Sequence, residues 1–232
     1  MRSAEEQSYM RNQCRVIHRQ EGLPELMDVI KRDNKHDVIV NYCNLLFQRI
    51  VLNTINISSI FVNNSLNGAK IRQAFPDLDA LVAFNYVFKA EENQSVSDFQ
   101  LLQKKTMETS LLLGNLVDVL DEIKFAKMKL LNLTSAAFVL ESKTCQLLLY
   151  LCFMSFNSGK RIGFTIDMTD LNRCVYPSEP SELLIKLCQA ETTLSQPSIE
   201  ETMVSIRNLQ PGRTVILRLC RMVSQLIQSL PC

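Results

Sequence analysis

The sequence has no tryptophan and few residues that favour turns, with 6 glycines and 7 prolines among 232 residues. Aromatic residues make up only 7% of the chain, whereas apolar residues as a whole make up 47%. A shortage of glycine and proline leaves few positions for tight turns, so this composition favours packed helices over a turn-rich β fold. A chain of this length can bury a sizeable core in one or two domains.

An excess of charge of one sign is also lacking, because 25 Lys and Arg residues balance 24 Asp and Glu residues to a net charge of +1. Nothing in this balance favours nucleic acid or an anionic membrane as a partner. No apolar run approaches the roughly 18 residues of a membrane span. The first twenty residues are polar and contain no signal-peptide core. We therefore expect an intracellular protein of the cytoplasm or nucleus that does not enter a membrane.

Motifs of common catalytic, cofactor and metal sites are missing. The two histidines, His18 and His36, have no nearby pattern of Ser, Cys or carboxylate residues, and no P-loop, dinucleotide-binding or zinc-protease motif is present. The acidic residues Asp118, Asp121 and Glu122 are interpreted as a solvated helix face. The eight cysteines form no Cys-x-x-Cys motif, so we expect buried free thiols in apolar helical stripes. The chain is therefore predicted to be no enzyme and to need no cofactor or metal.

The stretch from Gly22 to Asn53 is predicted to form two helices joined by a tight polar turn at residues 31–37. Pro24 sits where a helix can begin, because its missing N–H would be unpaired there in any case. Apolar residues at spacings of three and four give each helix one apolar face. These residues are Leu23, Leu26, Met27 and Ile30 in the first helix, and Val38, Ile39, Tyr42, Leu45, Leu46 and Ile50 in the second. Such a hairpin must stack on similar units to bury both faces.

Helical patterns continue along the rest of the chain. Helices are predicted over residues 3–20, 77–92, 98–123, 124–140, 142–157, 182–191, 199–209 and 214–230. Residues 53–75 suit short helices with loops or, alternatively, a pair of strands. The segment 142–157 is apolar on all sides and should be central. Gly114, inside a helix, is expected to mark a close helix contact, because glycine there costs roughly 1 kcal/mol relative to alanine.

Four of the segments share a related ending: CNLLFQRI at 43–50, SLLLGNLV at 110–117, YLCFMSFN at 150–157 and VSIRNLQP at 204–211. The pattern resembles the third helix of an armadillo repeat, which is similar to A-L-x-N-L. Gly22-x-Pro24 resembles the start of that family's second helix, and residues 159–162 resemble its inter-repeat linker. The shared polar positions 48, 115, 155 and 208 lie 67, 40 and 53 residues apart. Only one interval fits a unit of about 40–47 residues, so the others require insertions.

The resemblance implies an all-α fold, a right-handed superhelical stack of helical repeats of the armadillo-like α-solenoid type. Residues 1–232 would form one domain, with helices at 1–21 and 211–232 capping its ends. The alternative is an irregular helical bundle whose helices share only generic periodicity. Without tryptophan the chain cannot build the indole ladder of nuclear-import receptors, so that subgroup is disfavoured.

In an armadillo-like stack the third helices line a concave groove that binds a peptide or helix of another protein. The resemblance implies a groove formed by Asn41, Asn44, Gln48, Glu108, Leu111, Asn115, Leu151, Ser155, Glu201, Val204 and Asn208. Their amides could pair with a ligand backbone, and their apolar members could anchor it. The expected function is a non-enzymatic protein–protein interaction module or scaffold. The alternative is a helical subunit of a complex that contacts nucleic acid; self-association remains open.

Overall fold

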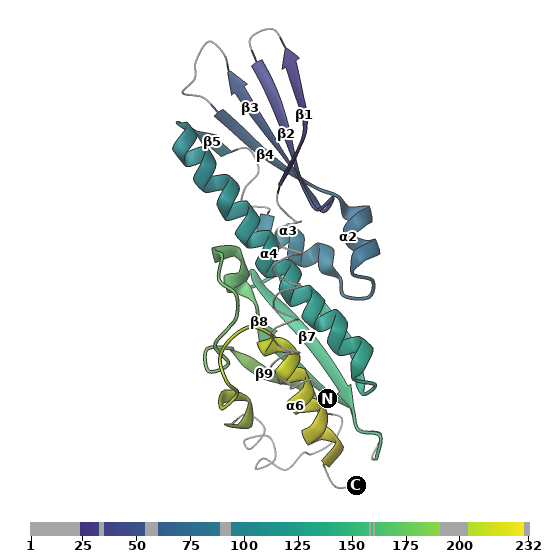
Figure 1. The fold of residues 1–232 in the computed structure, drawn as a ribbon. Helices are drawn as coiled ribbons and strands as arrows, with labels where there is room; N and C mark the ends of the chain where they lie inside the picture. The colour runs from purple at the N-terminus through teal and green to yellow at the C-terminus, as the bar shows by residue number, and fades with distance from the viewer. Residues whose placement is uncertain are drawn as a thin grey trace, which may run out of the picture. The chain divides into compact units, whose positions relative to one another are not determined.

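Nine strands in two antiparallel sheets occupy much of the described chain, so the all-α prediction is wrong (Figure 1). The structure is a computed structural model that describes residues 24–32, 35–53, 60–88, 94–157, 159, 161–190 and 204–229. The fold is α+β, and no armadillo-like stack of helical repeats is present in these ranges. The predicted capping helix at 1–21 lies outside the described residues.

The chain divides into two compact units, which are described separately. The first comprises residues 1–70 and 91–114, and the second comprises residues 71–90 and 115–232. The long helix α4 (Phe99–Lys129) contributes its first half to one unit and its second half to the other. The short helix α2 (Gly68–Ala74) also begins in the first unit and ends in the second.

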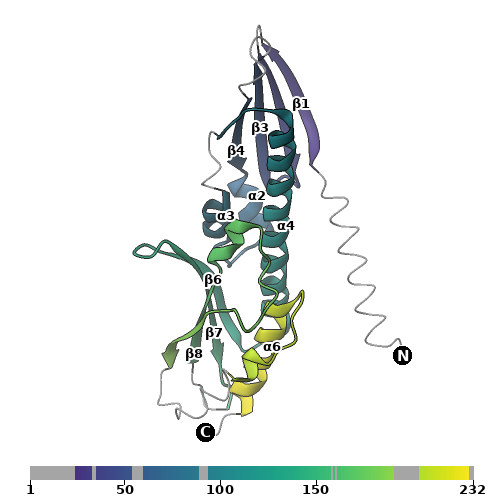
Figure 2. The same cartoon turned by 90° about the vertical axis from the view of Figure 1, so that its left-hand side faces the viewer.

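The first unit is built on a five-stranded antiparallel sheet in the order β1-β2-β3-β4-β5. Its strands are β1 (Glu25–Arg32), β2 (Lys35–Tyr42), β3 (Leu46–Asn53), β4 (Ile60–Leu66) and β5 (Gln94–Val96). Figure 2 shows the first half of α4 lying against one face of this sheet. On that face Ile50, Ile60 and Val62 form an apolar cluster, against which Leu102 of α4 packs. Alternation along each strand directs these side chains to one face.

The predicted helical hairpin at 22–52 is instead the three strands β1, β2 and β3. The segments Val38–Tyr42 and Leu46–Leu52 are nearly continuous apolar runs, which satisfy a helical and a strand pattern equally. Their β-branched residues favour the pleated conformation. The turn between β2 and β3 is closed by Cys43 and Asn44, whose φ angles of 54° and 58° are those of a hairpin turn. Of the residues 31–37 that were expected in a polar turn, 31–32 belong to β1 and 35–37 belong to β2.

The second unit is built on a four-stranded antiparallel sheet in the order β6-β7-β8-β9. Its elements are α3 (Ala80–Phe88), β6 (Leu133–Glu141), β7 (Gln146–Met154), β8 (Arg161–Asp167), the 3-10 helix η2 (Thr169–Arg173), β9 (Ile185–Ala190) and α6 (Val215–Ser229). Gln228 of α6 donates a hydrogen bond to the carbonyl of Met154 at the end of β7. Tyr150 on β7 lies over Gly163 on β8, where an added Cβ would come within 2.9 Å of its hydroxyl oxygen.

The predicted central helix at 142–157 is mostly β7, and that prediction is wrong. Leu147, Leu149, Leu151 and Phe153 are fully buried and alternate with half-buried residues, as in a strand with one face in the core. The helix predicted at 182–191 is likewise β9, and the segment 133–141 within the predicted helix 124–140 is β6. By contrast, helices α3, α4 and α6 lie where helices were predicted. The four armadillo-like endings thus belong to strands and helices alike.

Candidate functional site

The outer edge of β1 is one end of the five-stranded sheet of the first unit. β1 is the first strand of the sheet, and within the described residues it pairs only with β2 (Figure 1). It is eight residues long, which is longer than an average strand. A strand in this position presents main-chain N–H and C=O groups that can pair with an added strand.

β1 carries four charged residues, Glu25, Asp28, Lys31 and Arg32, together with exposed apolar residues. Natural edge strands usually carry charges or proline, which discourage pairing with other chains. Here Leu26 is 64% exposed and Val29 is 50% exposed. They lie opposite Val40 and Val38 of β2, which pack against the core cluster beneath α4. The apolar face of the sheet therefore continues outward from the core to its edge.

The ladder between β1 and β2 contains one irregularity. The register shifts between Leu26 and Asp28, which leaves Met27 as a bulged residue. A bulge bends its strand and increases the local twist. Regular pairing resumes at Asp28 and continues through Arg32. The regular part of the exposed edge is thus short, with an acidic residue at its start and a basic residue near its end.

Asp28 covers part of this edge with its own side chain. Its carboxylate oxygen Oδ1 accepts a hydrogen bond of 2.8 Å from the backbone N–H of Val29. The contact is exposed to solvent and joins two adjacent residues. A cap of this kind can be displaced by rotation of one side chain. In the free chain, the Asp28 carboxylate therefore covers the Val29 N–H. A ligand can still reach this N–H if the Asp28 side chain rotates away.

Three predicted groove residues belong to the hairpin of β2 and β3. Asn41 accepts a hydrogen bond of 2.9 Å from the backbone N–H of Asn44, so this pair stabilises the turn. Gln48 is fully buried in β3, where its amide oxygen accepts from Tyr42 and its amide nitrogen donates to Asn64 and Thr109. These side chains stabilise the first unit, and they do not line a groove.

Three further predicted residues follow one another along α4. Glu108 forms an ion pair of 3.4 Å with Lys105, and Leu111 is exposed. Asn115 donates a hydrogen bond of 2.9 Å to the carbonyl of Cys174, within the second unit. No added Cβ atom at Gly114 would meet a neighbour within 4 Å, so the close helix contact expected there is wrong for the described chain.

The remaining predicted groove residues are also dispersed. Leu151 is a core residue of β7, and Ser155 is buried just after that strand. Val204 and Asn208 are exposed, and the Asn208 N–H donates to the Val204 carbonyl in a helical turn. Glu201 lies outside the described residues. Of the four segments that were to line the groove as helices, 43–50 and 150–157 are mostly strands, whereas 110–117 is helical in α4.

The carboxylate of Glu122 is buried in the second unit, so the interpretation of this residue as part of a solvated helix face is wrong. Glu122, expected on a solvated face, is only 2% exposed. It accepts hydrogen bonds from the Tyr176 hydroxyl and, at 3.2 Å, from the backbone N–H of Leu217 in the first turn of α6. The Thr214 N–H in turn donates to the Tyr176 oxygen. Glu122 thus joins α4, the loop at Tyr176 and the positive end of α6.

Burial and the Glu122 charge also affect nearby titrating groups. Burial, followed by the charge of Glu122, raises the pKa of the Tyr176 hydroxyl. The same two causes raise the pKa of the Cys220 thiol to about 12. Both groups therefore stay protonated at neutral pH, and Tyr176 keeps the proton that it donates to Glu122. This network is a structural connection, since each of its polar groups is used in holding the elements together.

The cysteines are more accessible than predicted. The six that lie in the described residues are free thiols, and Cys43, Cys145 and Cys188 are exposed. Cys43 and Cys145 lie in turns, and Cys188 lies on β9. Among the described cysteines, Cys220 in α6 is buried in a helix as expected, and the expectation is wrong for the other five. Within the described ranges, no three His, Cys, Asp or Glu residues gather as metal ligands. None of the helices described there is long and apolar enough to cross a membrane.

Sequence reasoning missed the β1 edge because Leu26 and Val29 were assigned to a helix. The signal that could have found it is the pair of β-branched runs, Val29-Ile30 and Val38-Ile39-Val40, on either side of a polar Asp33-Asn34 sequence. Such a pattern is typical of a hairpin. Comparison of the sequence with protein-family models and with curated proteins gives no match.

Proposed function

We propose that this chain is a non-enzymatic protein-binding module that takes up an extended segment of a partner protein beside β1. The observation that carries the proposal is the edge of β1, where exposed Leu26 and Val29 flank main-chain groups that pair only with β2 in the described structure. Strand addition of this kind obtains affinity from main-chain hydrogen bonds and specificity from alternate side chains.

The side chains of β1 define the partner segment. On the α4 side of the sheet, Leu26 and Val29 favour apolar residues at alternate positions of the added strand. Near its two ends, Asp28 and Lys31 favour a basic and an acidic residue respectively. As the strand adds, the Asp28 carboxylate leaves the Val29 N–H, and a carbonyl of the partner replaces it. The expected ligand is therefore a short, alternating apolar segment with charges opposite to those of β1.

The test is selection of ligands from a displayed peptide library against the whole chain, followed by affinity measurement on two matched variants. Val29→Lys places a charge at the edge of β1, where it should weaken the selected peptides at least tenfold. Phe61→Lys is the control, because Phe61 is 49% exposed in the same sheet but lies on β4, which is paired on both sides.

The two variants separate strand addition from other modes of binding. We expect Phe61→Lys to change the affinity by less than twofold. Equal losses in both variants would show that the peptides recognise exposed apolar surface in general. Unchanged affinity in Val29→Lys would place the ligand elsewhere and reject the proposed edge.

A further inference from the structure

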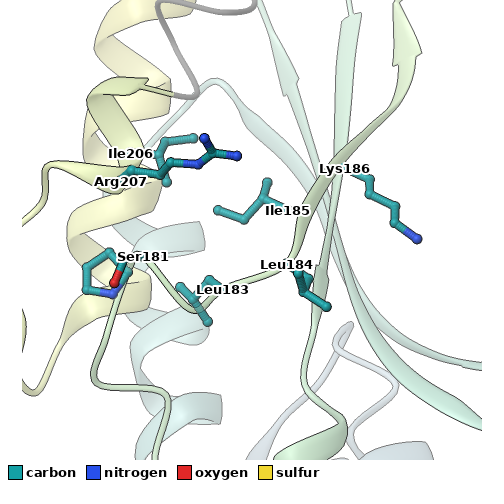
Figure 3. Close-up of a pocket in the computed structure, with 8 residues that line it drawn as sticks. Ser181, Leu183, Leu184, Ile185, Lys186, Ile206 and Arg207 are labelled. Carbon is teal, nitrogen blue, oxygen red and sulfur yellow. The ribbon is translucent and has the colours of Figure 1, made fainter.

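A small cavity in the second unit lies between the segment that leads into β9 and the helical turn at residues 204–207 (Figure 3). Its volume is about 190 Å³. Leu183, Ile185 and Ile206 line it with aliphatic side chains, and Ile206 is almost completely buried. Sites for small-molecule ligands usually occupy roughly 300–1,000 Å³, so this cavity is better matched to a single side chain of a larger ligand.

Two basic residues accompany this apolar lining. Arg207 extends from the helical turn across Ile206 toward β9, and Lys186 leaves the far side of β9 (Figure 3). Both side chains are exposed, and neither forms an ion pair within the described part of the chain. Glu182, in the segment before β9, is exposed and does not line the cavity. The charged residues among those that line the cavity are therefore both basic.

An apolar recess beside a guanidinium group fits a particular ligand chemistry. Interface energy is commonly concentrated where an apolar anchor fills a pocket and a neighbouring polar group is satisfied. The Arg207 guanidinium can bind a carboxylate through two parallel hydrogen bonds, which a lysine cannot do. A ligand with an apolar side chain next to an acidic one would use both features at once.

We propose that this cavity is a second peptide-binding site, which accepts one apolar side chain while Arg207 pairs with an adjacent carboxylate of the same peptide. Lys186 adds a longer-range attraction for acidic residues. This site is independent of the β1 edge, because it lies in the other unit and selects an acidic peptide rather than an alternating strand. It extends the protein-binding role to a ligand of different chemistry.

The probes are acetylated, amidated pentapeptides with two glutamates on each side of a central Leu, Met or Phe. Two matched sets carry lysine in place of glutamate, or serine in place of the central residue. Binding is followed through the methyl NMR signals of isotopically labelled isoleucines in the whole chain. We expect saturable shifts of the Ile185 and Ile206 signals with the acidic apolar peptides, and at least fivefold weaker binding of both control sets.

Variants of the protein test the role of Arg207 separately. Arg207→Glu should weaken the acidic peptides at least tenfold, whereas Arg213→Glu, at an exposed arginine in the turn before α6, should change binding less than twofold. The methyl spectrum of each free variant reports whether it is folded. Absence of shifts at Ile185 and Ile206 with all acidic peptides would overturn the site. Equal binding of the lysine peptides, or equal losses in both variants, would overturn the role of Arg207.

Discussion

β1 and β6 are both first strands of antiparallel sheets, but their outer edges are closed in different ways. The Phe138 N–H of β6 donates a hydrogen bond of 3.0 Å to the carbonyl of Leu78, a distant residue held in the same unit. The Val29 N–H of β1 donates to the side chain of its own neighbour, Asp28. A main-chain cap supplied by another packed segment is fixed by the fold, whereas a side-chain cap can rotate away. This difference is the reason why the proposed function places the partner strand beside β1 and not beside β6.

The buried polar groups of the two units show a related difference. In the first unit, Gln48 is bonded to Tyr42, Asn64 and Thr109, all of which are uncharged. In the second unit, the central group is the carboxylate of Glu122. A hydrogen bond to a charged group contributes more to stability than one between neutral groups. The second unit should therefore be the more sensitive of the two to loss of its central polar residue.

The largest effect is expected from Glu122→Ala. This change leaves the Tyr176 hydroxyl and the Leu217 N–H without their acceptor, and we expect a loss of about 3 kcal/mol in the free energy of unfolding. Urea denaturation, followed by circular dichroism, measures it. Asp121→Ala, at the exposed neighbouring position, should cost less than about 1 kcal/mol. Equal losses in the two variants would mean that the Glu122 network does not stabilise the fold.

A smaller loss is expected from Gln48→Ala in the first unit. The change deprives Tyr42 and Thr109 of a buried hydrogen-bond partner, and we expect a cost of about 2 kcal/mol. The same denaturation experiment compares it directly with Glu122→Ala. If Gln48→Ala were the more damaging change, the ranking of the charged above the neutral network would be wrong.

The Cys220 thiol should make the free energy of unfolding depend on pH to a moderate extent. Its pKa is raised from 9.0 to about 12 in the folded chain, so above pH 9 the unfolded chain loses this proton while the folded chain keeps it. Stability should therefore fall as pH rises through this window, by about 1.4 kcal/mol per pH unit from this group. Cys220→Ala should remove that component. Parallel pH profiles for the two proteins between pH 9 and 10.5 would contradict the assignment.

The smallest effect is a gain in stability. Gly114→Ala should stabilise the chain by about 0.5–1 kcal/mol, because alanine is the better helix former and no described neighbour lies within 4 Å of the added methyl group. Thermal denaturation should show a small increase in the melting temperature. A decrease would restore the sequence-based interpretation that Gly114 allows the close approach of another helix.

The elements that the sequence predicted correctly share a clear physical pattern. The segment that became α6 has polar and apolar residues on opposite helical faces, and the second half of α4 buries residues at helical spacing, such as Leu116, Leu120 and Ile123. The segment 146–154 has almost no polar residues, so its periodicity could not separate a buried helix from a buried strand. The turn at Cys43 and Asn44 contains no glycine, so the usual sign of a hairpin was missing there.

The candidate site could be predicted less well than the helices. Leu26 was recognised as an apolar residue of a regular element, but as a residue to be buried, and Val29 was not placed on the apolar face. Their exposure follows from the position of β1 at the end of the sheet order, which depends on pairing between segments far apart in the sequence. The cavity beside Arg207 depends in the same way on the approach of residues 204–207 to β9. The local sequence pattern shows neither the order of the strands in the sheet nor the approach of residues 204–207 to β9.

The most direct measurement of the central proposal is backbone amide hydrogen exchange, recorded with and without a selected peptide. In the free chain, Val29 should exchange quickly, whereas Phe138, with its main-chain acceptor, should exchange slowly. With the peptide bound, protection should increase at Val29 and Lys31, whose N–H groups face the outer edge by the alternation of an antiparallel strand, and remain unchanged in β6. Protection that appears elsewhere, with the exchange of β1 unaltered, would contradict the proposal that β1 accepts a partner strand.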